Sequence, residues 1–173
     1  IDGPSGSGKG TVSQQLARSL GWHYLDSGAI YRALAYAVDQ AAFSVDSNKQ
    51  QIVKLARELK LSFQPSEDGG AEVLLDGVNI TPFIRTEECG AMASILAADG
   101  DIRAALLQRQ RDFRKSPGLF ADGRDMGTVV FPDAKHKILL KASAQVRAER
   151  RYQKLKENWI NDIIPRLITV ISE

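Results

Sequence analysis

A glycine-rich stretch at the start of the chain constrains its fold more than any other feature. It reads GPSGSGKGT and matches the pattern G-x-x-x-x-G-K, whose glycines let the backbone curl so that several N–H groups point at one anion. Such a loop lies between a strand and a helix, and the helix is expected where Val12, Leu16 and Leu20 recur on one face. We expect a nucleoside triphosphate to bind here. The residues expected to hold its phosphates are Gly3, Pro4, Ser5, Gly6, Ser7, Gly8, Lys9, Gly10 and Thr11.

The loop departs from the usual pattern at position 10, where Gly10 replaces the Ser or Thr that normally binds magnesium. Lys9 still reaches the β- and γ-phosphates of a bound triphosphate. The hydroxyl of Thr11, one residue later, is expected to face a phosphate or a water molecule bound to magnesium. The form GxGKGT resembles the loop of nucleoside monophosphate kinases, which narrows the class of enzyme without naming the phosphoryl acceptor.

Helical and strand-like segments alternate along the chain, as in an α/β domain. Between residues 61 and 81, short β-like runs are separated by turn residues, which predicts a small antiparallel sheet inserted into this plan. The apolar runs that suit buried parallel strands are 22–26, 118–122 and 137–142. Amphipathic helices are expected after Asp26 or Ser27, over 48–60, from about Thr86, around Ile102 and from about Ser143.

The segment LDSGAIYR (25–32) is a candidate second anion site. It follows a strand and opens a helix, so Ser27 and the first helical N–H groups can meet an acceptor. Arg32, one turn later, can clamp the phosphate of that acceptor. The alternative is an ordinary capped helix with a solvated arginine, which competes well when the segment is taken alone.

The segment LFADGRDMGTVVF (119–131) places two carboxylates and an arginine beside the loop. Its apolar strand ends in Asp122, where phosphate-loop proteins often aim a carboxylate at magnesium. Arg124 and Asp125 follow at the carboxyl end of the strand, where open α/β sheets bind ligands. These two opposite charges could simply pair with each other, but their position favours a binding site.

Basic side chains form one stripe on the last expected helix, at Arg147, Arg150, Arg151 and Lys154. Stripes of this kind are usually solvated helix faces. Here the arginines would suit a lid that closes over the transferring phosphate, neutralises its charge and excludes water. The stripe has no aromatic platform beside it apart from Tyr152, which argues against nucleic-acid binding.

Composition limits the remaining roles. The 173-residue chain carries a net charge of +2, so an anion site has to come from local clustering. Its apolar runs are too short to span a membrane. The single cysteine, Cys89, cannot form an internal disulfide, which fits a reducing compartment and predicts a cytoplasmic protein. The sequence carries no recognisable interface patch, so a monomer is expected.

Four motifs together resemble those of bacterial cytidylate kinases: GPSGSGKGT, LDSGAIYR, IRTEE and ADGRDMGTVVFPDA. The resemblance covers almost the whole chain, and SGAIYR with GRDMGTVVFPDA is its most specific part. It implies an α/β P-loop kinase fold of three layers around a five-stranded parallel sheet, with an acceptor-binding insert and a helical lid. It also implies phosphoryl transfer from ATP, with Mg²⁺, to CMP or dCMP. The implied parts are a core of 1–38 and 99–142, an insert of 39–98 and a lid of 143–173.

The resemblance also implies roles for single residues. Cytosine offers an amino donor and a carbonyl acceptor, which an aspartate and an arginine complement. The residues implied to bind CMP are Ser27, Arg32, Ser94, Arg103, Arg124 and Asp125. The residues implied to act in catalysis are Lys9, Arg124 and Arg150. The lid residues implied to face ATP are Arg147, Arg150 and Arg151. The residues expected at magnesium, through water, are Thr11 and Asp122.

The family continues past its lid with a helix rich in Arg and Asp, then a last core strand and helix. We therefore expect this stretch of sequence to lack part of the acceptor site. Two alternatives stay open beside a CMP kinase. A kinase for another small acceptor, such as AMP, UMP or shikimate, would carry a different second motif, and SGAIYR with GRDMG argues against it. A P-loop binding module would bind ATP without a second nucleotide.

Overall fold

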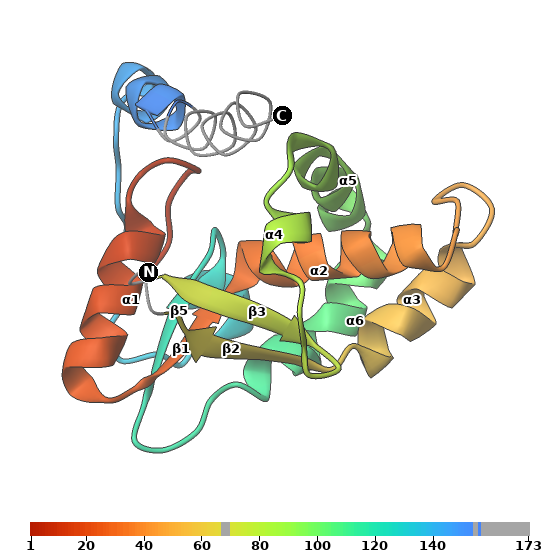
Figure 1. Ribbon diagram of the computed structural model, residues 1–173. Coiled ribbons are helices and arrows are strands. Elements are labelled where there is room, and N and C mark those ends of the chain that lie inside the picture. The colour runs from red at the N-terminus through yellow and green to blue at the C-terminus, as the bar shows by residue number, and fades with distance from the viewer. Residues whose placement is uncertain (67–69, 154–155, 157–173) are drawn as a thin grey trace, which may run out of the picture.

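Two parallel strands, β1 (His23–Asp26) and β5 (Leu119–Asp122), pair along their whole length at the centre of the fold. Asp2 extends this sheet through single parallel bridges to Gly123 and Leu139. The computed structural model describes residues 1–66, 70–153 and 156. In Figure 1, the first helix, α1, lies to one side of the sheets, and most of the other helices lie to the opposite side. The predicted α/β class is confirmed.

The strand predicted at 137–142 is wrong in its extent. Within the described residues only Leu139 pairs there, through its bridge to Asp2. The bridge is closed by two backbone bonds of 2.8 Å, from Asp2 N to Ile138 O and from Leu140 N to Asp2 O. The side chains of Ile138 and Leu139 are 49% and 60% exposed. Pairing does not continue past Leu140, because the chain turns into the glycine-rich loop directly after Asp2.

Helix α1 (Lys9–Leu20) follows the loop and ends at a glycine with a left-handed backbone, as predicted. The apolar face at Val12, Leu16 and Leu20 is not the buried one, because these side chains are 39%, 37% and 55% exposed. The helix instead buries Ser13 and Ala17 and packs on β5. These small side chains let the helix approach the strand closely, so the apolar stripe does not identify the contact face.

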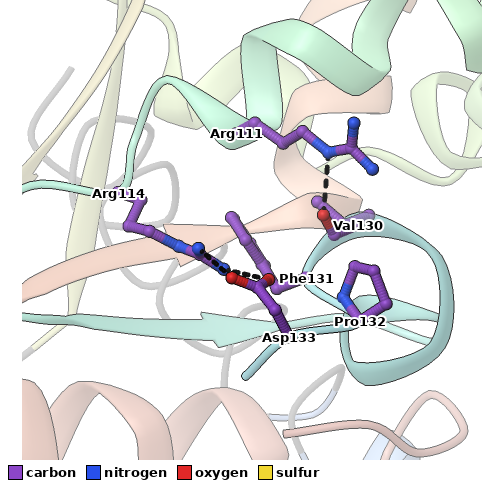
Figure 2. A pocket seen from close by; sticks show the side chains of 6 residues that line it. All are labelled: Arg111, Arg114, Val130, Phe131, Pro132 and Asp133. Carbon is purple, nitrogen blue, oxygen red and sulfur yellow. Dashed lines mark hydrogen bonds and ion pairs between the residues drawn. The ribbon is translucent and has the colours of Figure 1, made fainter. Parts of the chain in front are cut away.

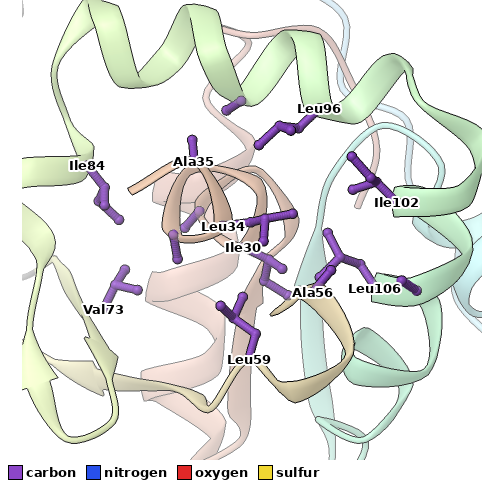
Figure 3. Close-up of a cluster of buried hydrophobic side chains, with 14 of the residues drawn as sticks. Ile30, Leu34, Ala35, Ala56, Leu59, Val73, Ile84, Leu96, Ile102 and Leu106 are labelled. Atoms are coloured by element: carbon purple, nitrogen blue, oxygen red, sulfur yellow. The ribbon is translucent and has the colours of Figure 1, made fainter. Parts of the chain in front are cut away.

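Helix α2 (Ser27–Gln40) runs through the middle of the molecule and carries much of the core (Figure 1 and Figure 3). The apolar side chains spaced four residues apart along it, Ile30, Leu34 and Val38, are buried, as the amphipathic pattern expected after Asp26 predicts. Asp26 caps the helix, because its carboxylate accepts a hydrogen bond from Ala29 N at 3.0 Å. Loss of such a cap typically costs about 1 kcal/mol. The cap and the apolar face together fix where α2 starts and how it is oriented.

Three further helices close the core around α2. They are α3 (Lys49–Glu58), α5 (Glu87–Ala98) and α6 (Gly100–Arg111). In Figure 3, Leu96 of α5 and both Ile102 and Leu106 of α6 lie in the same cluster as the side chains of α2. Thr86 caps α5 and Asp99 caps α6 with side-chain oxygens. The predicted helices are present, and their buried faces meet at α2.

The small antiparallel sheet predicted between residues 61 and 81 is present. Asp76 and Gly77 join its last two strands, and their positive φ angles (50° and 83°) are those of a tight hairpin turn. The run VNIT predicts a strand up to Thr81, but the short helix α4 (Thr81–Ile84) begins there instead, because Pro82 favours the first turn of a helix. The strands of the sheet are β2 (Leu61–Pro65), β3 (Ala71–Leu75) and β4 (Val78–Asn79).

Two helical segments complete the described chain. A short π-helix, η1 (Met126–Val130), follows β5, although the β-branched run TVV does not suggest a helix. The basic helix predicted from Ser143 is present over residues 144–153, and the Ser143 hydroxyl accepts a hydrogen bond from Val146 N at 3.2 Å. Lys154 and most of the predicted lid beyond it lie outside the described residues. No helix in the described part of the chain has the length and apolarity needed to cross a membrane.

Candidate active site

The glycine-rich loop wraps in front of the N-terminus of α1. Gly6 and Gly8 have φ angles of 77° and 94°, in the left-handed region that side chains other than hydrogen disfavour. Gly8 is the N-cap of α1, and no side chain caps that helix. The N–H groups of its first turn therefore remain available to an anion, which the positive end of the helix dipole also attracts.

Lys9 lies at the centre of the charges around the loop. Its ammonium group donates to Pro4 O at 3.5 Å, which holds the side chain against the loop. The same charge lowers the pKa values of Asp26 and Asp122 and so partly offsets the effect of their burial. The structure therefore places Lys9 between the anion-binding loop and two carboxylates, as a phosphate-binding lysine requires.

The two carboxylates end neighbouring parallel strands. Asp26 lies opposite Asp122 in the β1–β5 register, so both side chains emerge at the same edge of the sheet. Burial, and to a smaller extent the charge of Asp26, raise the pKa of Asp122 to about 7. Burial also raises the pKa of Asp26. Asp122 was predicted at this site, whereas Asp26 was predicted only as a helix cap; two strands that each end in Asp were the missed signal.

Tyr24 holds Asp122 in place. Its phenol donates to Asp122 Oδ2 at 2.5 Å and accepts a hydrogen bond from Gln14 Nε2 at 3.3 Å. Burial and the two carboxylates raise the pKa of Tyr24, so the phenol keeps its proton and stays a donor. Neither Tyr24 nor Gln14 was a predicted site residue, and no short motif marks them.

Gly10 lies beside the Asp122–Tyr24 pair. A Cβ at this position would lie 3.4 Å from Asp122 Oδ2 and 3.7 Å from the Tyr24 hydroxyl, which are ordinary van der Waals contacts. Thr11, the next residue, lies exposed in the first turn of α1. The carboxylate of Asp122 thus occupies the side of the loop that a residue at position 10 would otherwise approach.

Arginines of the 144–153 helix contact the loop. Arg150 Nη1 donates to Gly6 O at 3.2 Å and to Ser7 O at 2.9 Å. Arg147 packs so closely on Gly6 that a Cβ there would lie 3.2 Å from Arg147 Cβ. Arg151 forms an ion pair with Glu87 at the start of α5. The basic stripe is therefore more than a solvated helix face, because it contacts both the phosphate loop and the start of α5.

The structure brings Arg103 and Asp125 together from α6 and the segment after β5. Arg103 Nη2 and Asp125 Oδ2 lie 2.7 Å apart. Arg124 is exposed and makes no hydrogen bond or ion pair with another described residue. The alternative in which Arg124 pairs with Asp125 is therefore not what the structure shows, and the Arg124 guanidinium is available to a ligand.

The other residues predicted to bind the acceptor already have partners in the protein. Ser27 Oγ donates to the buried Gln110 Oε1 at 2.9 Å, a partner that was not predicted. Arg32 Nη1 donates to two backbone carbonyl oxygens between α4 and α5, at 2.7 and 2.9 Å. Ser94 Oγ donates to Gly90 O at 2.9 Å. A Cβ at Gly90 would lie 2.5 Å from Arg32 Nη2, so this glycine makes room for the arginine.

A pocket of about 250 Å³ lies between the end of α6 and the segment after η1 (Figure 2). Arg114 makes two bonds to Asp133, of 2.7 and 2.8 Å, and its guanidinium lies 4.7 Å from the centre of the Phe131 ring. Arg111 donates to Val130 O at 2.9 Å. Protein groups thus hold both arginines, and the end of the motif GRDMGTVVFPDA lines this pocket, at residues 130–133.

The donor set suits magnesium better than a softer metal. Asp26 and Asp122 offer carboxylate oxygens beside the loop, and Mg²⁺ commonly binds one or two carboxylates together with the phosphates of a substrate. Among residues 1–66, 70–153 and 156, no group of three or more His, Cys, Asp or Glu side chains could hold a metal ion.

Comparison with known proteins places the chain in a family. The family model described as cytidylate kinase matches residues 1–173. The cytidylate kinase of Colwellia psychrerythraea is 53% identical over 173 residues, which cover 100% of this chain and 76% of the relative. That of a Marinomonas species is 57% identical over 157 residues, 91% of this chain and 69% of the relative. That of Aeromonas salmonicida is 53% identical over 173 residues, 100% of this chain and 74% of the relative. This chain belongs to the cytidylate kinase family.

Proposed function

We propose that this chain transfers the γ-phosphoryl group of ATP to CMP or dCMP and releases ADP with CDP or dCDP. Its family and its identity with relatives named cytidylate kinase support this activity. The observation that carries the proposal is the pairing of Arg103 with Asp125 just beyond the strand that ends in Asp122. The Arg103–Asp125 pair, which suits cytosine, therefore lies just after Asp122, whose carboxylate suits the phosphate site.

The donor site is built from the loop and the lid. The first-turn N–H groups of α1 and the Lys9 ammonium bind the β- and γ-phosphates of ATP. Arg147, Arg150 and Arg151 bring positive charge from the lid, and the contact of Arg150 with loop carbonyls supports this role. Their positive charge neutralises the charge of the transferring phosphate. Closure of the lid excludes water from that phosphate.

The acceptor site is built from the edge of the sheet and the insert. Arg124 binds the phosphate of CMP, and Asp125 with Arg103 reads the amino and carbonyl groups of cytosine. Ser27, Arg32 and Ser94 complete the site. Each keeps hydrogen-bonding capacity beyond its present bond, since a hydroxyl also accepts and a guanidinium has five N–H groups.

Asp122 and Thr11 would hold Mg²⁺ through water molecules, with Asp26 beside them. When bound there, Mg²⁺ would neutralise part of the charge on the β- and γ-phosphates. Tyr24 keeps the Asp122 carboxylate oriented by donating to one of its oxygens. The second oxygen is the one left for the bound water.

The transfer needs no strong general base, because the acceptor oxygen of CMP is already ionised at neutral pH. The protein therefore acts by placing the two phosphates in line and by neutralising charge. Lys9, Arg124 and Arg150 are the residues that we propose to do so.

An acceptor panel in an ADP-release assay tests the proposal. CMP and dCMP should be phosphorylated far faster than UMP or AMP. A higher rate with UMP or AMP would identify another monophosphate kinase. Calorimetry with CMP alone separates a kinase from a binding module, since only the kinase has a second nucleotide site.

We further propose that the protein is a monomer of the cytoplasm that binds ATP and CMP but no nucleic acid. Light scattering coupled to gel filtration tests the oligomeric state. A mass twice that of the chain would contradict the monomer.

A further inference from the structure

The carboxylate of Asp2 holds the start of η1 from outside that helix. Asp2 Oδ1 accepts a hydrogen bond from Met126 N at 2.8 Å, and Oδ2 accepts one from Gly127 N at 2.9 Å. The first N–H groups of a helix have no partner within it, and Met126 is buried. Without Asp2 these two donors would have to find another acceptor.

Asp125 is the residue that would normally provide that acceptor. It occupies the N-cap position of η1, and Asp is among the preferred N-cap residues. Asp26 and Asp99, at the same position in α2 and α6, both cap their own helices. The Asp125 side chain makes no such bond, and its Oδ2 pairs with Arg103 instead.

Asp2 is held rigidly enough to replace that cap. Its backbone is bonded on one side to the segment around Leu139, and the neighbouring Gly3 N donates to Gly123 O at 3.2 Å. Gly123 N donates back to Ile1 O at 3.1 Å. Asp2 also lies directly before the phosphate loop, so one residue ties the donor loop to the segment that carries Asp125.

We propose that Asp2 is a positioning residue for acceptor recognition. Asp2 caps η1 in place of Asp125. The Asp125 carboxylate is therefore free to pair with Arg103 and to contact the acceptor base. The inference rests on the proposed function and adds to it a residue that touches neither substrate. Without the Asp2 carboxylate, Asp125 is the nearest side chain able to cap η1. If the Asp125 carboxylate caps η1, it no longer pairs with Arg103 and no longer contacts the acceptor base.

The test is Asp2→Asn, which keeps the size of the side chain but replaces one acceptor oxygen by an amino group. With ATP saturating, we expect kcat/KM for CMP to fall by about tenfold or more, as for loss of a partly buried hydrogen bond to a charged group. The preference for CMP over UMP should fall to that of Asp125→Asn. KM for ATP should change by less than about twofold, because the loop keeps its backbone bonds. The double variant should lose no more preference than Asp125→Asn alone.

Asp133→Asn is the matched control. Asp133 anchors the far end of the same segment through Arg114 and lies outside the proposed site, so its loss should leave the preference unchanged. If Asp2→Asn does not fold, as judged by circular dichroism, Asp2→Glu replaces it. That variant keeps the charge, but its extra methylene displaces both oxygens from the two N–H groups, and the same loss is expected.

Three results would overturn the inference. One is a folded Asp2 variant with the wild-type preference. Another is an equal rise of KM for ATP and CMP, which would mark a general disturbance of the loop. The third is a wild-type preference in Asp125→Asn, which refutes the base-reading role of Asp125 in the proposed function itself, and the inference with it. Only in that third case does the fault lie in the proposed function.

Discussion

Lys9 acts on both aspartates of the site. It lies against the loop and lowers the pKa values of the half-buried Asp26 and the buried Asp122. Lys9→Ala should reduce kcat by about 100-fold or more, which is the size of effect that loss of one transition-state donor has elsewhere. The fold should persist, since among the described residues Lys9 makes a single hydrogen bond, which is long. Steady-state kinetics and circular dichroism check both parts; near wild-type turnover in Lys9→Ala would refute the role.

Tyr24 acts on the proposed magnesium site through Asp122. Its hydrogen bond lowers the pKa of that carboxylate, against the larger effect of burial. Tyr24→Phe should therefore leave more of Asp122 protonated at pH 7 and raise the Mg²⁺ concentration needed for half-maximal rate. The difference should disappear near pH 9, where the carboxylate is ionised in both proteins.

Magnesium titrations at pH 7 and pH 9 measure this effect, and binding of Mn²⁺ followed by electron paramagnetic resonance gives a readout without turnover. Tyr36→Phe is the control, because Tyr36 stacks on Phe83 far from the two carboxylates and keeps that ring contact as Phe. A Tyr24→Phe protein with unchanged metal dependence at pH 7 would show that the phenol does not orient Asp122.

At the scale of elements, the 144–153 helix is held to the insert by the ion pair of Arg151 with Glu87. Both side chains are largely exposed, so the pair is expected to contribute no more than about 1 kcal/mol. Glu87→Gln should change KM for ATP by less than about fivefold at low salt. The difference in KM between Glu87→Gln and the wild-type protein should shrink at high salt, because salt screens the Arg151–Glu87 ion pair of the wild-type protein.

Kinetics at two salt concentrations test the contact between lid and insert. Glu88→Gln is a matched control, because Glu88 lies in the same first turn of α5 and makes no ion pair among the described residues. Any effect through the helix dipole would appear in both variants. Equal values of KM for ATP in Glu87→Gln and Glu88→Gln at both salt concentrations would therefore show that the ion pair has no role in ATP binding.

Element prediction succeeded where local signals agreed with tertiary packing. In α2, the Asp26 cap and the spacing of Ile30, Leu34 and Val38 specify the same start and the same buried face. In α1, periodicity predicted the helix but not its buried face, because close approach to β5 selects Ser13 instead. Small residues carry no apolar signal, so a sequence pattern does not reveal such a contact.

The site could be predicted wherever one short motif holds all the residues involved. The loop and Asp122 followed from such motifs. Asp26, Tyr24 and Gln110 did not, because their roles depend on partners about 80 to 100 positions away: Asp122 for the first two and Ser27 for the third. The role of Asp2 at η1 depends on the strand bridge that brings residues 2 and 123 together.

At the scale of the whole molecule, apolar and charged interiors are separated. The apolar core surrounds α2 (Figure 3), whereas the carboxylates of Asp26 and Asp122 lie at the ends of β1 and β5, beside the loop. Burying a carboxylate favours its protonated form. The pair Asp26 and Asp122, which suits magnesium bound to a nucleotide, therefore makes the stability of the metal-free protein depend on pH.

Asp122 gives this sensitivity a definite sign. Its pKa is about 7 in the folded protein and near 3.9 in an unfolded chain, so the folded state binds the proton more tightly. Its contribution to stability is complete below about pH 4 and is lost as the pH rises through 7. The free energy of unfolding should therefore fall between pH 5 and pH 8, by at most about 1.4 kcal/mol per pH unit for this group. Burial of Asp26 acts in the same direction.

Urea denaturation of the metal-free protein at pH 5, 6, 7 and 8 measures this slope, with Asp122→Asn as the comparison. The amide does not titrate and can still accept the Tyr24 hydrogen bond, so the variant should show a flatter profile. Groups shared by the two proteins cancel in the difference between their curves. Asp133 does not interfere, because its ion pair with Arg114 lowers its pKa to about 2 and its contribution is lost only below the tested range. Parallel profiles for the two proteins would mean that Asp122 is already ionised in the folded state, with Lys9 outweighing the effect of burial.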